Sequence, residues 1–172
     1  MPAQSVAVVH PKEESELAEQ GEFLEDYQQI YNSIARRAFE MFESEGGAFG
    51  RELEHWFKAE SELLHPVYLE VTESPEGFNV SAEVPGFSPK DLEISVEPRR
   101  LTIVGKRETK EEKKKGKLVY KDRLSDQLLR IVDLPAEINT DKVKATLDSG
   151  VLMLEAPKAA PAKKIAVETK AA

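Results

Sequence analysis

Hydrophobic and polar residues alternate from residue 67 to about residue 157, with the period of two that is typical of half-buried β-strands. The alternation is clearest in residues 77–85 and 92–97. Turn-forming sequences such as Ser74-Pro75-Glu76-Gly77 and Ser149-Gly150 separate the runs. Many short strands with regular turns and no long helix between them predict an all-β, immunoglobulin-like sandwich over residues 66–157.

The preceding residues, 13–65, have a helical period. Apolar side chains recur at spacings of three and four from Tyr27 to Met41, and a second apolar stripe surrounds Trp56. Gly46 and Gly47 interrupt the helical pattern, and Pro66 ends it. We expect two amphipathic helices that pack on each other, on the sandwich or on another chain. Residues 1–12 are expected to be disordered.

Charge is distributed unevenly along the chain. The net charge of the 172 residues is -8, and the acidic residues concentrate in the first 64. An acidic face around an apolar stripe suits a surface that must expose hydrophobic area without precipitating. The acidic balance argues against nucleic acid as a partner, because phosphate contacts need clustered Lys and Arg. The basic run from Lys113 to Lys117 lies beside Glu111 and Glu112 and is typical of a solvated loop.

Cysteine is absent from the sequence, which excludes disulfides and thiol catalysis and is compatible with a reducing compartment. The first 16 residues lack the pattern of a secretory signal, and no apolar run has the length of a membrane span. We therefore expect a cytoplasmic protein that does not act at a membrane.

No pattern in the sequence predicts catalysis, a cofactor or a metal site. The three histidines, His10, His55 and His65, are isolated and lack the spacing of metal ligands. The glycines of residues 46–50 are not followed by the Lys-Ser or Lys-Thr of a phosphate-binding loop. We expect a protein that is not an enzyme and needs no cofactor.

Four features of the sandwich region and the tail resemble the small heat shock proteins and their α-crystallin domain. Together these features span about 100 residues, and Ser149 stands where the family has Asn. The resemblance implies the sandwich fold and a chaperone role. The features are Ala145-Thr-Leu-Asp-Ser-Gly-Val-Leu152, Val84-Pro-Gly-Phe-Ser-Pro-Lys-Asp-Leu92, Leu134-Pro135 with Arg130, Ile138 and Val143 around it, and Ile165-Ala166-Val167.

The helical region has a resemblance of its own. Residues 34–64 resemble a short, uncharacterised helical domain of bacterial proteins, which brings no known activity with it. The shared features are Ala35-Arg36-Arg37-Ala38, the glycine break, and Glu52-Leu-Glu-His-Trp56 followed by Ala59-Glu60.

The C-terminal extension, residues 158–172, is rich in Ala and Lys and is expected to be flexible. Ile165 and Val167 would lie on the same side of an extended chain. The family resemblance implies that they anchor in a groove on a neighbouring subunit. The groove positions it implies are Leu92, Ile94, Val96, Val143, Ala145 and Leu147.

The insert between Arg107 and Asp122 is long for a hairpin loop. The resemblance implies that it carries a short strand, Leu118-Val119-Tyr120, which pairs with a partner's sheet and forms a dimer. It also implies that Arg130 is a buried ion-pair partner near this interface. A surface loop and an exposed arginine remain as alternatives.

These features predict an ATP-independent holdase that forms dimers and larger homo-oligomers and binds partly unfolded client proteins. The alternative is a non-oligomeric co-chaperone adaptor whose helical arm recognises one specific partner. The candidate client-binding residues are the aromatic side chains of the helical arm, Phe23, Tyr27, Phe39, Phe42, Trp56 and Phe57.

Overall fold

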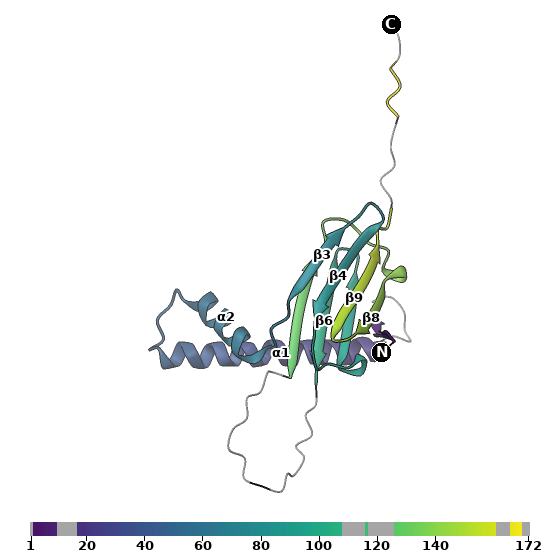
Figure 1. Ribbon diagram of the computed structural model, residues 1–172. Helices are drawn as coiled ribbons and strands as arrows, with labels where there is room; N and C mark the ends of the chain where they lie inside the picture. The colour runs from purple at the N-terminus through teal and green to yellow at the C-terminus, as the bar shows by residue number, and fades with distance from the viewer. Residues whose placement is uncertain (1, 10–16, 108–115, 117–125, 161–165, 170–172) are drawn as a thin grey trace.

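A computed structural model describes residues 2–9, 17–107, 116, 126–160 and 166–169, and Figure 1 shows how they are arranged. The described residues form a two-sheet β-sandwich with a helical hairpin beside it, which confirms the predicted fold class. The strands are β1 (Gln4–Ser5), β2 (Val8–Val9), β3 (Leu69–Glu73), β4 (Gly77–Glu83), β5 (Leu92–Glu97), β6 (Arg100–Lys106), β7 (Gln127–Asp133), β8 (Lys144–Asp148) and β9 (Val151–Pro157).

The described strands divide into a five-stranded sheet, in the order β1-β8-β9-β4-β3, and a four-stranded sheet, in the order β2-β5-β6-β7. Neighbouring strands are antiparallel except β2 and β5, which run parallel. Short 3-10 helices at Pro89–Asp91 and Thr140–Lys142 precede β5 and β8. At one side of the sandwich, β8 of the first sheet and β5 of the second are each followed by one short outermost strand, β1 and β2 respectively.

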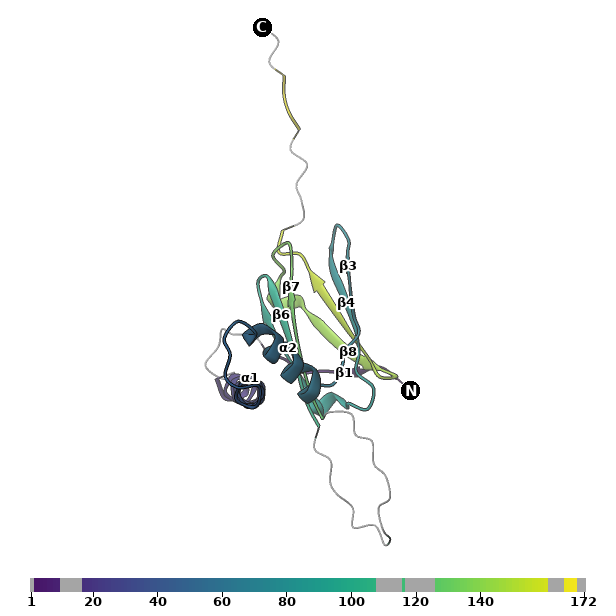
Figure 2. The same ribbon diagram turned by 90° about the vertical axis from the view of Figure 1, so that its left-hand side faces the viewer.

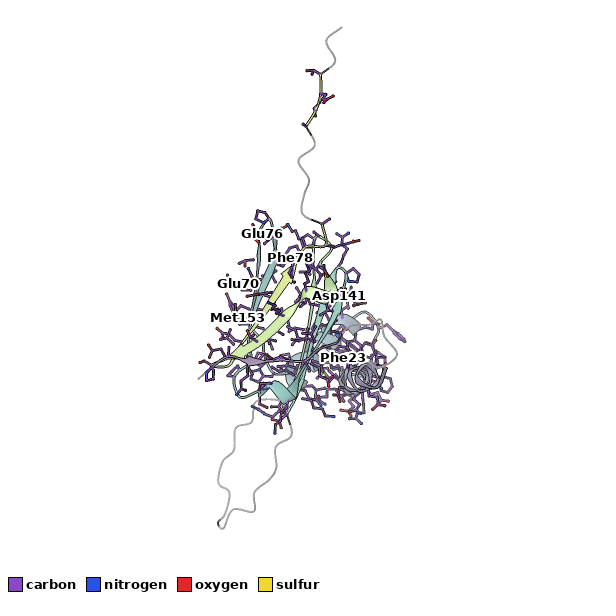
Figure 3. The ribbon with its side chains drawn as sticks, turned by 90° about the vertical axis from the view of Figure 1, so that its right-hand side faces the viewer. Phe23, Glu70, Glu76, Phe78, Asp141 and Met153 are labelled. Atoms are coloured by element: carbon purple, nitrogen blue, oxygen red, sulfur yellow. The ribbon has the colours of Figure 1, made fainter. Side chains whose placement is uncertain are left out.

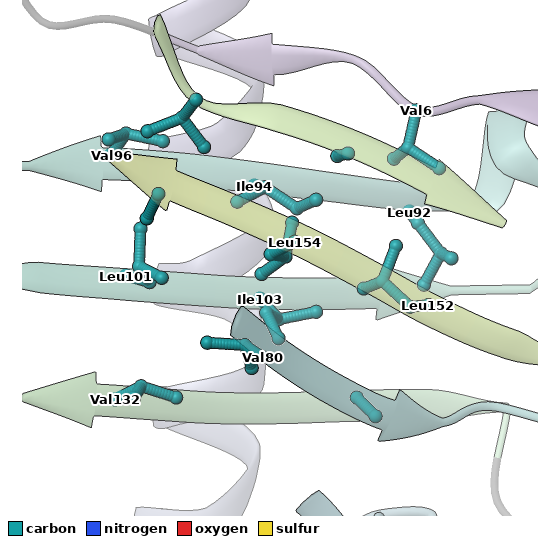
Figure 4. Close-up of a cluster of buried hydrophobic side chains, with 14 of the residues drawn as sticks. Val6, Val80, Leu92, Ile94, Val96, Leu101, Ile103, Val132, Leu152 and Leu154 are labelled. Atoms are coloured by element: carbon teal, nitrogen blue, oxygen red, sulfur yellow. The ribbon is translucent and has the colours of Figure 1, made fainter. Parts of the chain in front are cut away.

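The alternation of the strands produces the core. In β4 and β9 every second side chain is buried, and the inner faces of the two sheets interdigitate as in other sandwiches. Figure 4 shows the centre of this cluster, with Ile94 and Ile103 of one sheet facing Val80 and Leu154 of the other. The sandwich is therefore held together mainly by aliphatic packing between its sheets.

The turn between β8 and β9 has two residues, Ser149 and Gly150, both with positive φ (51° and 77°). This is the backbone twist that a two-residue hairpin needs, and Asn or Gly adopts it at lower cost than Ser. Ser149 thus closes the hairpin in a conformation for which Asn is the better residue.

The helical arm is a hairpin of α1 (Leu17–Ser44) and α2 (Glu52–Leu63). Gly46 and Gly47 both have positive φ, and their N–H groups donate to carbonyls of the last turn of α1, which ends the helix. Figure 2 shows the hairpin lying against the outer face of β6 and β7. Ile30, Ile34 and Ala59 form one buried cluster with Val104 of β6.

The expectation that residues 1–12 are disordered is wrong for residues 4–9. Gln4 and Ser5 pair with β8, and Val8 and Val9 pair with β5. Val6 lies between these two pairings and is buried in the sandwich core. The physical reason is that the two sheet edges have backbone groups to satisfy and apolar side chains to cover.

Truncation of Ile30 tests the packing of the helical hairpin. Ile30 is fully buried, so Ile30→Ala should lower the free energy of unfolding by about 2–5 kcal/mol. Leu24→Ala is the matched control on the same helix, because Leu24 is 61% exposed and its truncation should cost less than about 0.5 kcal/mol. Urea unfolding followed by the fluorescence of Trp56, the single tryptophan, measures both. Equal losses in the two variants would contradict the packing described.

Candidate assembly groove and exposed aromatic surface

The six predicted groove residues come together where β5 and β8 face each other across the open side of the sandwich. All six are buried and belong to the sandwich core. The strands that position them are β5 for Leu92, Ile94 and Val96 and β8 for Ala145 and Leu147, with Val143 just before β8.

The chain's own N-terminal segment, residues 4–9, occupies this groove. Gln4 and Ser5 lie opposite Leu147 and Thr146, and the Val6 N–H donates to the Ala145 carbonyl at 3.0 Å. Val8 then lies opposite Ile94 in the other sheet. Figure 4 shows the Val6 side chain directed into the cluster near Leu92. One extended segment thus connects the edges of both sheets.

Sequence reasoning missed this segment, although its signal was present. Val6 is buried, Ala7 is exposed and Val8 is partly buried, the alternation of an extended chain with one apolar side. Val6-Ala7-Val8 repeats the pattern of Ile165-Ala166-Val167, in which two β-branched aliphatic residues flank an alanine. A run this short was overlooked because it adjoins polar residues and a proline.

Of the two predicted anchor residues, Ile165 and Val167, the structure describes Val167. Ile165 lies outside the described residues. Val167 is 88% exposed, so it does not occupy the groove of its own chain. Its role as an anchor on another subunit stays a prediction.

The predicted dimer strand, Leu118-Val119-Tyr120, also lies outside the described residues. Among the described strands, β3 pairs with β4 alone and β7 pairs with β6 alone, so each leaves one edge of its sheet unpaired there. Figure 3 places Glu70 on β3, away from the helical hairpin. The acidic residues Glu70 and Glu73 of β3 are exposed.

Arg130 is exposed in the single chain. Its Nη1 donates to the Val67 carbonyl at 3.0 Å, which ties β7 to the segment that leads into β3. Among the described residues no carboxylate pairs with it. Its proximity to β3 is compatible with a place at the predicted interface, and that role stays a prediction.

The six candidate client-binding residues divide into two groups. Phe23 is buried between α1 and the sandwich, as Figure 3 shows, and Tyr27 packs against the same cluster. Trp56 packs there too, with its ring 4.9 Å from that of Tyr31. The structure therefore uses these three to attach the hairpin.

The other candidates lie towards the solvent. Phe39 is 57% exposed and Phe57 is 62% exposed. Phe42 is half-buried, and its ring centroid lies 6.0 Å from that of Phe39 and 5.6 Å from that of Phe49. Sequence reasoning missed Phe49, which is 87% exposed in the turn between the helices. We call Phe39, Phe42 and Phe49 the tip aromatics.

A polar cluster holds the turn between α1 and α2, which carries Phe49 and adjoins the end of α1 with Phe39 and Phe42. The Glu45 carboxylate accepts from His55 Nε2 at 2.9 Å and from Arg51 Nη1 at 2.7 Å. Arg51 also pairs with Glu54. The hydrogen bond from His55, with the nearby Arg51 charge, lowers the pKa of Glu45 below its usual range. The His55 ring is buried and packs edge-on against Phe42.

The structure offers no evidence of a metal or membrane site within its described parts. No group of three or more His, Asp or Glu side chains there could hold a metal ion. None of the helices described is both long enough and apolar enough to cross a membrane.

Acid should loosen the hairpin turn through Glu45. A carboxylate whose pKa is lowered by folding stabilises the folded state above its ordinary pKa, near 4.3, and loses this contribution as the pH falls through the lowered value. As the pH is lowered from about 5 to about 3, the Tm of wild type should therefore fall more steeply than the Tm of Glu45→Gln. Glu25→Gln removes the same charge from an exposed site on α1 and should keep the wild-type slope. Identical slopes for wild type and Glu45→Gln would refute the role of this carboxylate.

Two family models match this chain, one over the sandwich and the tail and one over the helical arm. The family model described as the Hsp20/alpha crystallin family matches residues 70–170. A second model, described as a protein of unknown function (DUF2934), matches residues 29–65, which confirms the resemblance of the helical arm to an uncharacterised domain.

Two named relatives match the chain over about 100 residues each. Small heat shock protein C2 of Rickettsia felis is 32% identical over 101 residues, which cover 59% of this chain and 66% of that protein. The 18.1 kDa class I heat shock protein of Arabidopsis thaliana is 35% identical over 98 residues, or 56% of this chain and 60% of that protein. The matches thus span less than two thirds of the length of these relatives.

Among solved structures, heat shock protein 16.0 from Schizosaccharomyces pombe has a similar fold. The TM-score is 0.50 and the sequence identity is 25%, with 59% of this chain and 97% of that chain covered. The family model matches more than half of the chain, and the sandwich has the fold that this family implies. The chain belongs to the Hsp20/alpha crystallin family of small heat shock proteins.

Proposed function

We propose that this protein is an ATP-independent holdase, a chaperone that binds partly unfolded proteins and keeps them from aggregating. The observation that carries the proposal is the combination of an α-crystallin sandwich with a helical hairpin that exposes Phe39, Phe49 and Phe57. A folded protein seldom exposes several large aromatic side chains close together without a partner. Partly unfolded proteins expose apolar surface that such side chains can bind.

The client-binding surface is the outer part of the hairpin, with Phe39, Phe49 and Phe57. Salt bridges between α1 and α2, such as Arg37 to Glu62 at 2.8 Å, and the Glu45 cluster fix the frame that presents these rings. The exposed acidic residues around them keep the surface hydrated and oppose self-association through like charge. The surface can therefore remain exposed and still be available to clients.

Assembly occurs in two steps in this proposal. The insert that contains Leu118, Val119 and Tyr120 pairs with β3 of a partner, whose edge is available among the described strands. Lysines 113–115 and Lys117 of the insert complement the exposed Glu70 of that edge, whereas the neighbouring Glu73 already pairs with Lys158 at 2.7 Å. Pairing there also protects a sheet edge that would otherwise invite aggregation.

In the second step, Ile165 and Val167 anchor in the groove between β5 and β8 of a neighbouring subunit. Burial of each side chain contributes roughly 1.5–3 kcal/mol, and the cost of ordering the tail offsets much of it. One anchor is therefore weak, whereas several anchors on paired subunits hold a large particle that still exchanges subunits. Self-association and client binding are both parts of the proposal, as is the cytoplasmic location expected from the sequence.

An adaptor that does not oligomerise is the second candidate. The observation in its favour is that residues 4–9 already fill the groove, so the single chain leaves no free site for a tail. The two candidates differ in what the tail does, and a variant of the tail separates them.

Substitution on the hairpin tests the client-binding surface. Phe39→Gln with Phe57→Gln should raise, by about 30-fold, the concentration needed to suppress aggregation of a heated client without ATP, because two aromatic anchors at about 1 kcal/mol each contribute about 2 kcal/mol. Leu24→Gln is the matched control, since Leu24 is as exposed but lies near the other end of α1. Light scattering measures all three proteins. Wild type that fails to reduce scattering at stoichiometric amounts would rule out the holdase.

Truncation of the tail anchor tests assembly. Ile165→Ala with Val167→Ala should convert large particles into dimers, because the two anchors lose most of their buried apolar area. Ala166→Ser is the matched control between them. Native mass spectrometry and size-exclusion chromatography measure the change. An unchanged mass for the double variant would favour the adaptor.

A further inference from the structure

The groove between β5 and β8 offers a partner the backbone N–H and C=O groups of the two strands and the apolar side chains between them. Residues 4–9 contact both. The Ala145 carbonyl accepts the Val6 N–H, and the side chain of Val6 is buried against the core. On the other side, β2 pairs in register with Ile94 and Ser95 of β5. A second extended strand cannot pair with these edges while residues 4–9 are in place.

The chain contains two segments with the chemistry that the groove accepts. Val6-Ala7-Val8 and Ile165-Ala166-Val167 each present two β-branched aliphatic side chains at a spacing of two, separated by the same small residue. The first lies in the groove, whereas Val167 of the second is exposed. The two segments are therefore equivalent ligands for one site.

We propose that residues 4–9 are an intramolecular competitor that the Ile165-Ala166-Val167 tail of a second copy must displace in order to bind. This inference rests on the proposed function, in which that tail anchors subunits to one another. The N-terminal segment binds from within its own chain, so its effective concentration is fixed, whereas the concentration of tails rises with that of the protein. Assembly is then set by the balance of the two segments.

Displacement has a consequence beyond assembly. Each tail that binds releases an N-terminal segment with three exposed valines, Val6, Val8 and Val9. In the single subunit Val6 is buried and Val8 is partly buried, and both become available in the particle. A weaker competitor shifts the population towards particles, and a stronger one shifts it towards small species.

A reversible lock tests the proposal directly. Ser5 and Thr146 are directly opposite each other on β1 and β8, and the chain contains no cysteine. Neighbouring residues Val6 and Ala145 face the core, so this pair lies on the outer side of the sheet. Ser5→Cys with Thr146→Cys should form a disulfide that holds residues 4–9 in the groove. Failure of the two thiols to pair would contradict the register and overturn the proposal.

Two measurements compare the oxidised and reduced forms of the double cysteine variant: the mass of its oligomers and its affinity for a tail peptide. The oxidised full chain should remain a small species by native mass spectrometry and should form particles after reduction. A labelled peptide of residues 158–172 should bind the oxidised form at least about tenfold more weakly than the reduced form, in a background with Ile165→Ala and Val167→Ala. Equal peptide affinity in the two redox states would overturn the proposal. Ser5→Cys alone is the control and should show no redox effect.

A second variant acts in the opposite direction. Val6→Asn with Val8→Asn should release the N-terminal segment and strengthen binding of the same peptide by about tenfold, because the competitor no longer holds the groove. Ala7→Asn changes the exposed residue between them and should leave the affinity unchanged. Unaltered peptide binding by the Val6 and Val8 variant would contradict the competition.

The outcomes separate this inference from the proposed function. A particle that survives loss of Ile165 and Val167 would refute the tail as the anchor, whatever the lock does. Particles that require the tail but form equally well in the oxidised lock would refute the competition and leave the anchor role intact.

Discussion

The interaction on which the rest of the structure depends is the closure of the groove between β5 and β8. Without residues 4–9, β5 and β8 would be edges of different sheets, and they would leave backbone groups unpaired and the aliphatic side chains of the core uncovered on the same side. Buried backbone groups must be paired, and an open apolar edge invites association with other chains. In the single chain residues 4–9 close it. If the chain's own residues 4–9 fill the groove, the single chain covers its apolar core; if they do not, a segment of another chain has to cover it.

The helical hairpin covers a second apolar surface, the outer face of β6 and β7. Phe23, Ile30 and Ile34 cover Val104 there, so one side of α1 is used for attachment. The rings of Phe39 and Phe49 lie beyond this attachment and stay exposed. The same helix thus provides both a core contact and an exposed apolar surface, to which the proposed function assigns client binding, and the acidic side chains around it keep that surface in solution.

The sequence predicted the sandwich well because a period of two fixes which side chains face inwards. The groove residues, Ile94 and Ala145 among them, came from the family resemblance and not from that period. It did not predict which aromatic residues of the arm are exposed. Phe23 and Phe39 both lie on α1, and their exposure depends on how far the sheet extends beneath the helix, which is a tertiary contact. Residues 4–9 were misjudged because the alternation of Val6, Ala7 and Val8 is too short to predict a strand by itself, and a short strand gains its order from the edges it pairs with.

Amide hydrogen exchange across a dilution series tests the central claim most directly, because it observes both competing segments in the unmodified chain. In dilute protein, the amides of residues 4–9 should be protected and those of residues 164–168 should exchange freely. As the concentration rises and particles form, protection should move from the first segment to the second. Protection of both segments at once, or N-terminal protection that does not change with assembly, would contradict the account.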